Sequence, residues 1–269
     1  MTIPYITPTQ QEIPKLIYKF RFLNRLQIQK LLNHKYHNRI NDWLNSLTKK
    51  QYIEKLPQKN TFEERTKLTI YRIGINGIRF LKTQDDISSG LLRKLYRDKD
   101  RSDNFINNQC LFLADIYLDL REQSTKSGSV SYEVTTASEF ASTDSPFYFL
   151  TELAPHLIAK RKEKQQKKTT GRYHLLEIFE PTLPRYSIRK RLRTYLEFFY
   201  SNEWANNTDN TAFPIIFLIC PTKPFLIYVK RFTKKLLEEE QNPEDLDIQF
   251  TIADQVKEFG VTGASWEEV

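Results

Sequence analysis

The sequence predicts an α+β fold in two domains, and three observations support this prediction. Three segments near the start carry apolar residues at helical spacing, and two short segments rich in β-branched and aromatic residues follow them. Later segments mix strand-like and amphipathic helical patterns. Positive charge is concentrated in the first part of the chain. We place the first domain at residues 1–83, a polar linker or hinge at 84–103, a mixed α/β domain at 104–240 and an acidic C-terminal tail at 241–269.

The composition is that of a globular protein. The chain of 269 residues has 39% hydrophobic and 13% aromatic residues, which is enough for ordinary cores. Cys110 and Cys220 show no paired spacing, which argues against a disulfide framework or a cysteine-bound zinc ion. No stretch approaches the roughly 18 to 20 apolar residues of a membrane span, and the first residues do not have the pattern of a signal peptide. We therefore expect a cytoplasmic protein.

The charge is unevenly distributed along the chain. Residues 1–82 hold 16 Lys and Arg against 5 Asp and Glu, a net of +11. Residues 83–240 hold 24 against 21, a net of +3, and residues 241–269 hold 1 against 7, a net of −6. A compact basic domain could serve a membrane surface or an acidic partner, but its commonest target is a phosphate backbone.

Three helices are predicted in the first domain. The first follows Pro14, and the second begins at Asn24, which forms a variant capping box with Gln27. The third extends over residues 39–49 and buries an apolar stripe that includes Ile40 and Leu47. Residues 51–56 and 68–73 then predict a hairpin around a long charged loop, and Asn76 is expected to cap a closing helix. This order of elements is typical of a winged helix-turn-helix.

In such a fold the third helix enters the major groove of DNA, and its polar side chains contact base edges or phosphates. The candidates for these contacts lie in and just before that helix, at its end and in the wing. They are His37, Asn38, Arg39, Asn41, Asn45, Lys49, Lys50, Lys59, Arg65 and Lys67. The alternative interpretation is a protein–protein adaptor in which these residues form only a solvated face.

The second domain is predicted to mix helices and strands. Residues 104–121 favour a largely buried helix, and 130–136 alternate like a strand. Residues 146–153 with 157–159, and then 173–179, are interpreted as strands of a hairpin. An amphipathic helix is expected at 188–199, and the apolar run 213–221 between prolines predicts a strand buried on both faces. The following residues, from Leu226, suggest a further short strand or the start of a helix.

Basic residues in this domain are candidates for secondary phosphate contacts, with a solvated loop as an equal alternative for the hairpin. Those of the hairpin are Lys160, Arg161, Lys162, Lys164, Lys167 and Lys168, and those of the helix are Arg189, Lys190 and Arg193.

The order of a winged helix, Pro155-His156, the strand LLEIFEPTLP, the helix RKRLRTYLEFF and the strand FPIIFLICP resembles the replication-relaxation family of plasmid and mobile-element proteins. That resemblance covers most of residues 15–235. It implies a winged helix joined to a degenerate domain of the PD-(D/E)xK nuclease-like class, in a prokaryotic protein associated with the nucleoid or a plasmid.

The resemblance also identifies the positions where a nuclease site would lie. Pro155-His156 matches the Pro-Asp of the class, and Glu177-Ile178-Phe179 matches its acidic-x-Lys pattern. Of the charged residues in these two motifs, only Glu177 is present in this sequence. A working site needs two carboxylates for a divalent ion and a Lys. His156 is the first candidate to join Glu177 at a metal, and Glu152, Glu180 or His174 are others, although His174 is three residues from Glu177 and should point to the opposite face of a strand.

The remaining motifs do not indicate an enzyme. The seven glycines form no G-x-G-x-x-G array or P-loop, and the four histidines form no HExxH, so no cofactor or metal is expected. We expect a site-specific binder of double-stranded DNA from a mobile element, plasmid or phage, acting in replication initiation or transcription regulation. Its expected partners are duplex DNA, a second copy of the chain and replication or recombination proteins of the same element. The alternatives are a metal-dependent endonuclease centred on Glu177 and a protein-recruiting adaptor.

Overall fold

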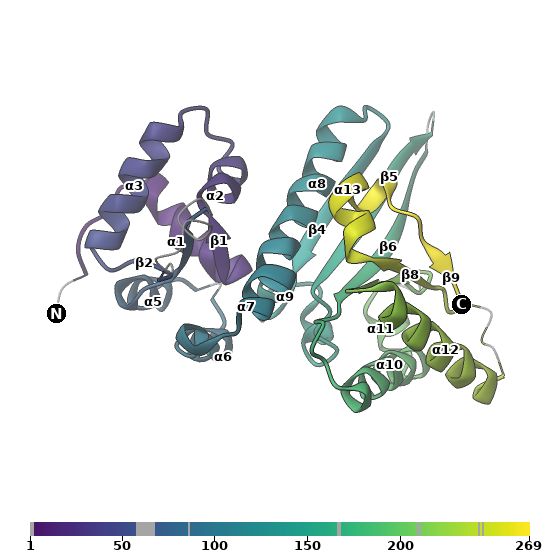
Figure 1. Cartoon of the computed structure of the whole chain (residues 1–269). Coiled ribbons are helices and arrows are strands. Elements are labelled where there is room, and N and C mark those ends of the chain that lie inside the picture. The colour runs from purple at the N-terminus through teal and green to yellow at the C-terminus, as the bar shows by residue number, and fades with distance from the viewer. Residues whose placement is uncertain are drawn as a thin grey trace. The chain divides into compact units, whose positions relative to one another are not determined.

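The chain forms an α+β structure with two compact units (Figure 1). This computed structural model describes residues 3–57, 68–85, 87–165, 168–208, 211–241, 243 and 245–269, without the side chains of residues 164–170. The first unit comprises Met1–Leu118 and Ala141–Asp144, and the second comprises Asp119–Phe140 and Ser145–Val269. The boundary between the units therefore falls inside a helix, not in the polar segment that was predicted to be a linker.

The first unit begins with three helices and a small antiparallel sheet. The strand order of this sheet is β1-β3-β2. Its elements are α1 (Pro8–Phe20), β1 (Phe22–Asn24), α2 (Arg25–Leu31), α3 (His37–Lys49), β2 (Ile53–Lys55), β3 (Ile70–Ile73) and α5 (Ile75–Leu81). The predicted hairpin is confirmed, because Ile53 pairs with Ile73 and Lys55 pairs with Tyr71.

Local signals in the sequence explain where these helices begin. The Gln27 backbone N–H donates to Asn24 Oδ1 at 3.0 Å, which confirms the predicted capping box of α2. The first helix starts earlier than expected, because Thr7 forms a second capping box and Pro14 is tolerated within the helix. The cap of α5 is Gly74 instead of Asn76. A Cβ atom at Gly74 would lie 2.4 Å from the Gln51 carbonyl oxygen, so this close approach requires glycine.

The predicted linker at 84–103 is wrong, because most of this segment folds into the first unit. It contains α6 (Ser89–Leu95) and the 3₁₀ helix η1 (Asp98–Asp100). Leu92, Leu95 and Asp98 are buried. Arg21 Nε donates to Asp98 Oδ2 at 3.1 Å, so the charged residue that suggested a solvated hinge is neutralised in the interior.

The helix predicted over 104–121 is present as one continuous helical segment of three parts. These are α7 (Asp103–Phe105), the π-helix η2 (Ile106–Leu111) and α8 (Phe112–Lys126). Gln27 Nε2 donates to the Leu111 carbonyl and to Asp115 Oδ1, both at 2.8 Å. Burial raises the pKa of Asp115, while the hydrogen bond from Gln27 and the charge of Lys30 lower it. These hydrogen bonds connect α2 to the start of α8 within the first unit.

The second unit is built around a six-stranded sheet with the order β4-β5-β6-β7-β8-β9. The first three strands are antiparallel, β6, β7 and β8 are mutually parallel, and β9 is antiparallel to β8. The strands are β4 (Val130–Thr136), β5 (Leu157–Gln165), β6 (Lys168–Ile178), β7 (Ile215–Cys220), β8 (Ile248–Ile252) and β9 (Glu267–Glu268). The prediction of a central buried strand is confirmed, because β7 has a neighbour on each side and nearly all of its residues are buried.

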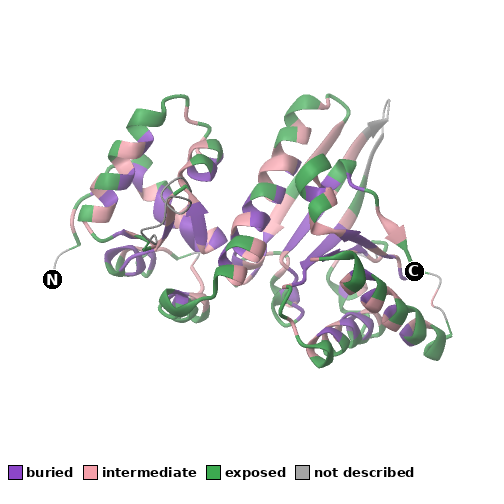
Figure 2. Ribbon diagram, in the orientation of Figure 1, coloured by how far each residue is buried: buried purple, intermediate pink, exposed green. Residues whose placement is uncertain are grey.

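Helices pack on this sheet and create the core of the second unit (Figure 2). They are α9 (Ala137–Phe140), η3 (Tyr148–Thr151), α10 (Arg185–Tyr200), α11 (Glu203–Asn207) and α12 (Lys223–Glu239). The last helix, α13 (Ala253–Gly263), contacts β8 and is not part of this core cluster. Leu192 of α10 and Val229 of α12 pack against Leu175, Leu218 and Phe250 of the sheet. The segment from Leu226, for which a strand or a helix start was open, is part of α12.

Two other expectations for this unit are wrong. Residues 146–153 form no strand and contain the 3₁₀ helix η3 over Tyr148–Thr151. The acidic tail at 241–269 instead supplies β8, α13 and β9, and Phe250 is fully buried. The net negative charge of the segment obscured the alternation of Ile248, Phe250 and Ile252, since the acidic residues lie outside β8.

The contribution of this last segment to stability is testable with two matched substitutions. Phe250→Ala removes a ring that is 0% exposed, and we expect it to cost about 3 to 5 kcal/mol of unfolding free energy. Phe259→Ala, the control, removes a ring that is 52% exposed and should change it by less than about 0.5 kcal/mol. Urea denaturation monitored by circular dichroism measures both. Equal, small effects would show that residues 241–269 contribute little to the fold.

Candidate nucleic-acid interface

The exposed side of α3 carries most of the polar residues predicted to contact DNA. Ile40, Leu44 and Leu47 are fully buried and anchor the opposite side of the helix. The exposed predicted residues are His37, Asn38, Arg39, Asn45 and Lys49, whereas Asn41 and Lys50 are partly buried. Asn38, Asn41, Asn45 and Lys49 follow one another at spacings of three or four residues, so they share one side of α3.

Contacts with neighbouring side chains fix several of these residues. The Arg39 guanidinium lies 5.7 Å from the ring of Trp43, which in turn meets the His34 ring edge-on at 5.0 Å. Lys55 Nζ donates to Asn45 Oδ1 at 3.1 Å. Lys50 differs from the prediction, because its Nζ donates to the Tyr5 carbonyl at 2.8 Å and is thus engaged within the unit.

Sequence analysis missed further cations around α3. Lys30 is exposed at the end of α2, Lys35 is exposed in the turn that follows, and Lys55 lies on β2. The shortage of acidic residues between positions 25 and 41 was the available signal, since no Asp or Glu occurs there. The predicted wing residues Lys59, Arg65 and Lys67 lie outside the described residues.

The basic residues of the β5–β6 hairpin do not form one cationic surface. Arg161 is paired with Glu163, Lys162 is paired with Glu133, and Lys160 Nζ lies 4.7 Å from the ring of Tyr173. Successive residues of a strand point to opposite faces, so Arg161 is directed away from Lys160 and Lys162. Lys167 lies outside the described residues, and the side chains of Lys164 and Lys168 are not described.

A stripe of arginines runs along α10. Arg185, Arg189 and Arg193 recur every four residues and are all exposed, as is the predicted Lys190. Arg189 Nε donates to the Tyr228 hydroxyl at 2.9 Å. The Arg185 guanidinium lies 4.9 Å from the Tyr228 ring, and those of Arg189 and Arg193 lie 5.4 and 5.8 Å from the ring of Phe232. Aromatic rings of α12 thus hold the three guanidinium groups in one row, which we name the arginine stripe.

On the inner side of α10, Glu177 is the centre of a buried cluster. Arg191 donates to Glu177 Oε2 at 2.6 Å and the Tyr195 hydroxyl donates to the same oxygen at 2.9 Å. His156 Nδ1 lies 3.6 Å from this oxygen, so the structure brings together the two residues predicted for a nuclease site. Arg191 also donates to the carbonyls of Leu153 and Ala154.

The electrostatics of this cluster match an ion pair and not a metal centre. Burial alone would raise the pKa of Glu177, but the Arg191 guanidinium and His156 lower it to about 2. A divalent ion at Glu177 would have to displace the guanidinium and lacks a second carboxylate. No group of three or more His, Cys, Asp or Glu suited to a metal occurs within the described ranges. His174, as expected from its spacing, lies on the other face of the sheet.

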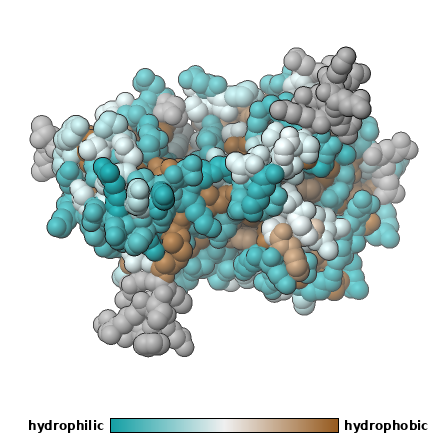
Figure 3. All heavy atoms as spheres, turned by 90° about the horizontal axis from the view of Figure 1, so that it is seen from above, coloured by the Kyte–Doolittle hydropathy of each residue, from teal (hydrophilic) through white to brown (hydrophobic). Residues whose placement is uncertain are grey.

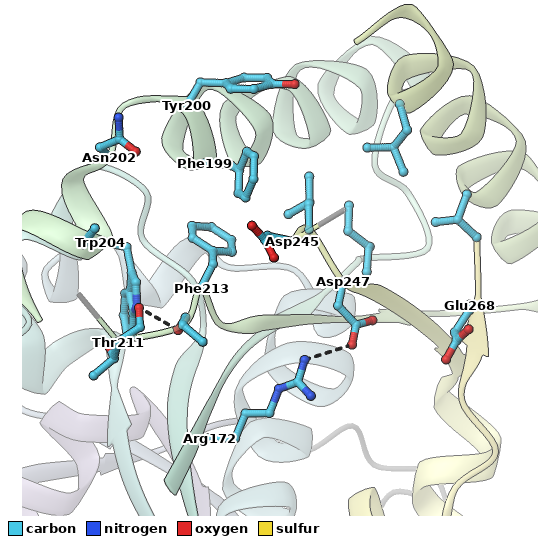
Figure 4. A pocket seen from close by; sticks show the side chains of 16 residues that line it. Arg172, Phe199, Tyr200, Asn202, Trp204, Thr211, Phe213, Asp245, Asp247 and Glu268 are labelled. Carbon is cyan, nitrogen blue, oxygen red and sulfur yellow. Dashed lines mark hydrogen bonds and ion pairs between the residues drawn. The ribbon is translucent and has the colours of Figure 1, made fainter. Parts of the chain in front are cut away.

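A hollow of about 850 Å³ in the second unit is lined by aromatic rings and carboxylates (Figure 4). Phe199 and Phe213 lie beside Asp245 and Asp247, and Glu268 stands on β9. Arg172 contributes a positive charge, and its NH2 lies 3.4 Å from Asp247 Oδ2. Carboxylates outnumber cations here, so this hollow repels phosphate.

The surface drawn in Figure 3 is largely hydrophilic, with hydrophobic residues in small patches. None of the described helices combines the length and the apolar composition that crossing a bilayer requires.

Comparison with known proteins gives one result that bears on identity. Searches among curated proteins and among solved structures give no match. The family described as replication-relaxation matches residues 15–212, which extend from within α1 through the rest of the first unit's helices and its sheet to the β4–β5–β6 strands and the arginine stripe of α10. Because this match spans well over half of the chain, the protein belongs to the replication-relaxation family.

Proposed function

We propose that the protein binds a specific site on double-stranded DNA of a mobile element, plasmid or phage, and acts there in replication initiation or transcription regulation. Membership in the replication-relaxation family indicates a function related to the replication of mobile elements. The observation that carries the proposal is the polar side of α3. Its residues Arg39 and Lys49, and Lys35 before it, have no carboxylate partner among the described residues.

The order of elements supports a winged-helix mode of binding. Helices α2 and α3 are joined by a short turn, and the β2–β3 hairpin follows α3. In this mode α3 lies in the major groove with its N-terminal residues near base edges. Arg39 pairs best with guanine and Asn41 with adenine, since each pairing forms two hydrogen bonds. Lys49 and Lys55, at the end of α3 and on β2, would contact phosphates.

The proposed contact of α3 with base edges is tested by selecting bound sequences from random duplex DNA. We expect one motif to be enriched by the full chain, and to be lost when Arg39→Ala is combined with Asn41→Ala, because loss of a bidentate contact costs about 1 to 3 kcal/mol of discrimination. Lys15→Gln is the control, since Lys15 lies on α1 and is paired with Glu12. Absence of duplex binding at low salt would contradict the proposal and favour the protein-recruiting adaptor.

The arginine stripe supports a second, sequence-independent contact. Exposed guanidinium groups held in a row fit the spacing of phosphates along a backbone and carry no information about base identity. Winged-helix proteins often bind as dimers, so we also propose a homodimer on two half-sites about 10 base pairs apart or a multiple of this distance.

Salt dependence measures this second contact. We expect Arg189→Gln with Arg193→Gln to reduce the slope of log K against log salt by up to about two units, since each lost phosphate contact removes about one. The enriched motif should be unchanged. Lys235→Gln, at an exposed lysine of α12 paired with Glu239, is the control. An unchanged slope in the double variant would exclude the arginine stripe from the DNA contact.

We further propose that the Glu177 cluster is structural and that the protein is not a nuclease. Arg191 neutralises the one acidic residue that the nuclease pattern retains, and Phe179 takes the place of the Lys. The cluster joins β6 to α10, so its removal should act on stability and not on phosphodiester cleavage.

The substitution Glu177→Gln distinguishes a structural role of Glu177 from a role in phosphodiester cleavage. We expect a loss of about 3 to 5 kcal/mol of unfolding free energy near neutral pH, because Arg191 is left as an uncompensated buried charge. The folded-state pKa of Glu177 is about 2, below the usual 4.5, so the pair stabilises fully above pH 4.5 and less as the pH falls toward 2. The difference in unfolding free energy between the natural protein and the Glu177→Gln variant, measured by urea denaturation, should therefore decrease as the pH falls from 4.5 toward 2. Glu197→Gln, at an exposed position of α10, is the control. Cleavage of DNA by the natural protein with Mg²⁺ or Mn²⁺, abolished by Glu177→Gln, would instead identify an endonuclease.

A further inference from the structure

A second, smaller cavity lies on the other face of the six-stranded sheet, within the second unit. Its volume is about 270 Å³. The sheet contributes side chains from β4, β5, β6 and β7, and α8 and α13 cover them with Leu120 and Val261. The polar residues of the lining include Tyr132, Arg161, His174 and Thr262.

His174 lines the cavity and is only 9% exposed. Burial lowers its pKa to about 4, so the imidazole is neutral at physiological pH. Its Nδ1 lies 3.4 Å from the Ala159 carbonyl, which favours a proton on Nδ1 and leaves Nε2 as a hydrogen-bond acceptor. An apolar side chain would fill this position without the cost of burying an imidazole.

Aromatic rings make one wall of the cavity rigid. Phe217 and Trp266 are stacked with centroids 4.1 Å apart and an interplanar angle of 17°. The Trp266 indole N–H donates to the Val261 carbonyl at 3.0 Å, which fixes the ring, and His174 lies 5.0 Å from Phe217. Ala159 is directly opposite His174 in the β5–β6 register, and its small side chain leaves the space open.

Arg161 brings a positive charge to the lining of the cavity. Arg161 lies directly opposite Arg172 in the β5–β6 register, so both side chains leave the same face of the sheet. Like charges in this position destabilise a sheet unless a counter-charge is present. Each arginine has one carboxylate neighbour, Glu163 for Arg161 and Asp247 for Arg172, and each has further N–H donors to offer. Arg161 lines this cavity whereas Arg172 lines the larger hollow, so Arg161 is the cation that an anion at the mouth would meet.

We propose that this cavity binds a small planar ring compound that carries one anionic group and a hydrogen-bond donor. The ring lies along Phe217 and the leucines, its donor faces His174 Nε2, and its carboxylate or phosphate meets Arg161. The volume is slightly below the roughly 300 Å³ at which pockets for drug-sized ligands begin, so one ring or two fused rings fit inside. Aromatic carboxylic acids and nucleoside monophosphates share this chemistry. The proposal is independent of DNA binding.

The two sources are distinguished by titration of the full chain in a calorimeter. One arm uses the 5′-monophosphates of adenosine, guanosine, cytidine and thymidine, with adenosine as the uncharged control. The other uses 4-hydroxybenzoate and indole-3-carboxylate, with indole as the uncharged control. We expect one arm to bind, with at least a 10-fold weaker affinity for its uncharged control.

Variants then locate the bound ligand. His174→Phe removes the acceptor but keeps a ring, and Arg161→Gln removes the charge at the half-exposed mouth, where folding is least disturbed. Each should weaken binding at least 10-fold, whereas Lys126→Gln, at an exposed lysine of α8, should not change it. Circular dichroism checks that each variant is folded. The proposal is overturned if neither arm binds at millimolar concentration, or if the folded Arg161→Gln variant binds as well as the natural protein.

Discussion

The second unit depends on the buried pair of Glu177 and Arg191. Two charges removed from water are stable only when hydrogen bonds compensate them, and the two terminal nitrogens of Arg191 donate to Glu177, to Tyr195 and to the carbonyls before β5. The Nε atom of Arg191 is buried and has no hydrogen-bond partner among the described residues. The pair thereby fixes β6, α10 and the start of β5 to one another. The pair also determines which side chains of α10 are directed away from the core. Because Arg191 points inward, residues two positions before and after it are turned about 160° away, which places Arg189 and Arg193 on the outer side.

Local patterns were sufficient to predict much of the first unit. The capping box of α2, the three buried positions of α3 and the β2–β3 pairing are encoded within a few residues of one another. Long-range partners explain the failures. Asp98 appeared solvated in the sequence because Arg21, which neutralises it, lies 77 residues away. The strand β8 was hidden by the acidic residues on either side of it, and its place in the sheet depends on pairing with β7.

For the candidate sites too, local patterns predicted some features, and features that depend on distant residues were missed. Periodicity within α3 identified the polar side of that helix, and the resemblance to a nuclease-like domain identified Glu177 and His156, which are indeed close together. Sequence alone did not indicate that Arg191 would neutralise Glu177, since the two are 14 residues apart on different elements. The arginine stripe was only partly predicted, because its order depends on rings supplied by α12. The cavity at His174 was not predicted, since six separate elements are needed to enclose it.

Charges of opposite sign lie in separate regions of the second unit. The arginine stripe attracts phosphate, whereas the hollow lined by Asp245, Asp247 and Glu268 repels it. Charges at a surface act over about 8 Å at physiological ionic strength, so each region affects only the backbone that comes close to it. The mouth at Arg161 differs from both, because its charge borders a narrow, largely apolar space that a DNA backbone cannot enter. Under the two proposals, the arginine stripe suits a polymer and the cavity at Arg161 suits a small anion, and a rise in salt concentration should weaken binding at the stripe far more than binding in the cavity.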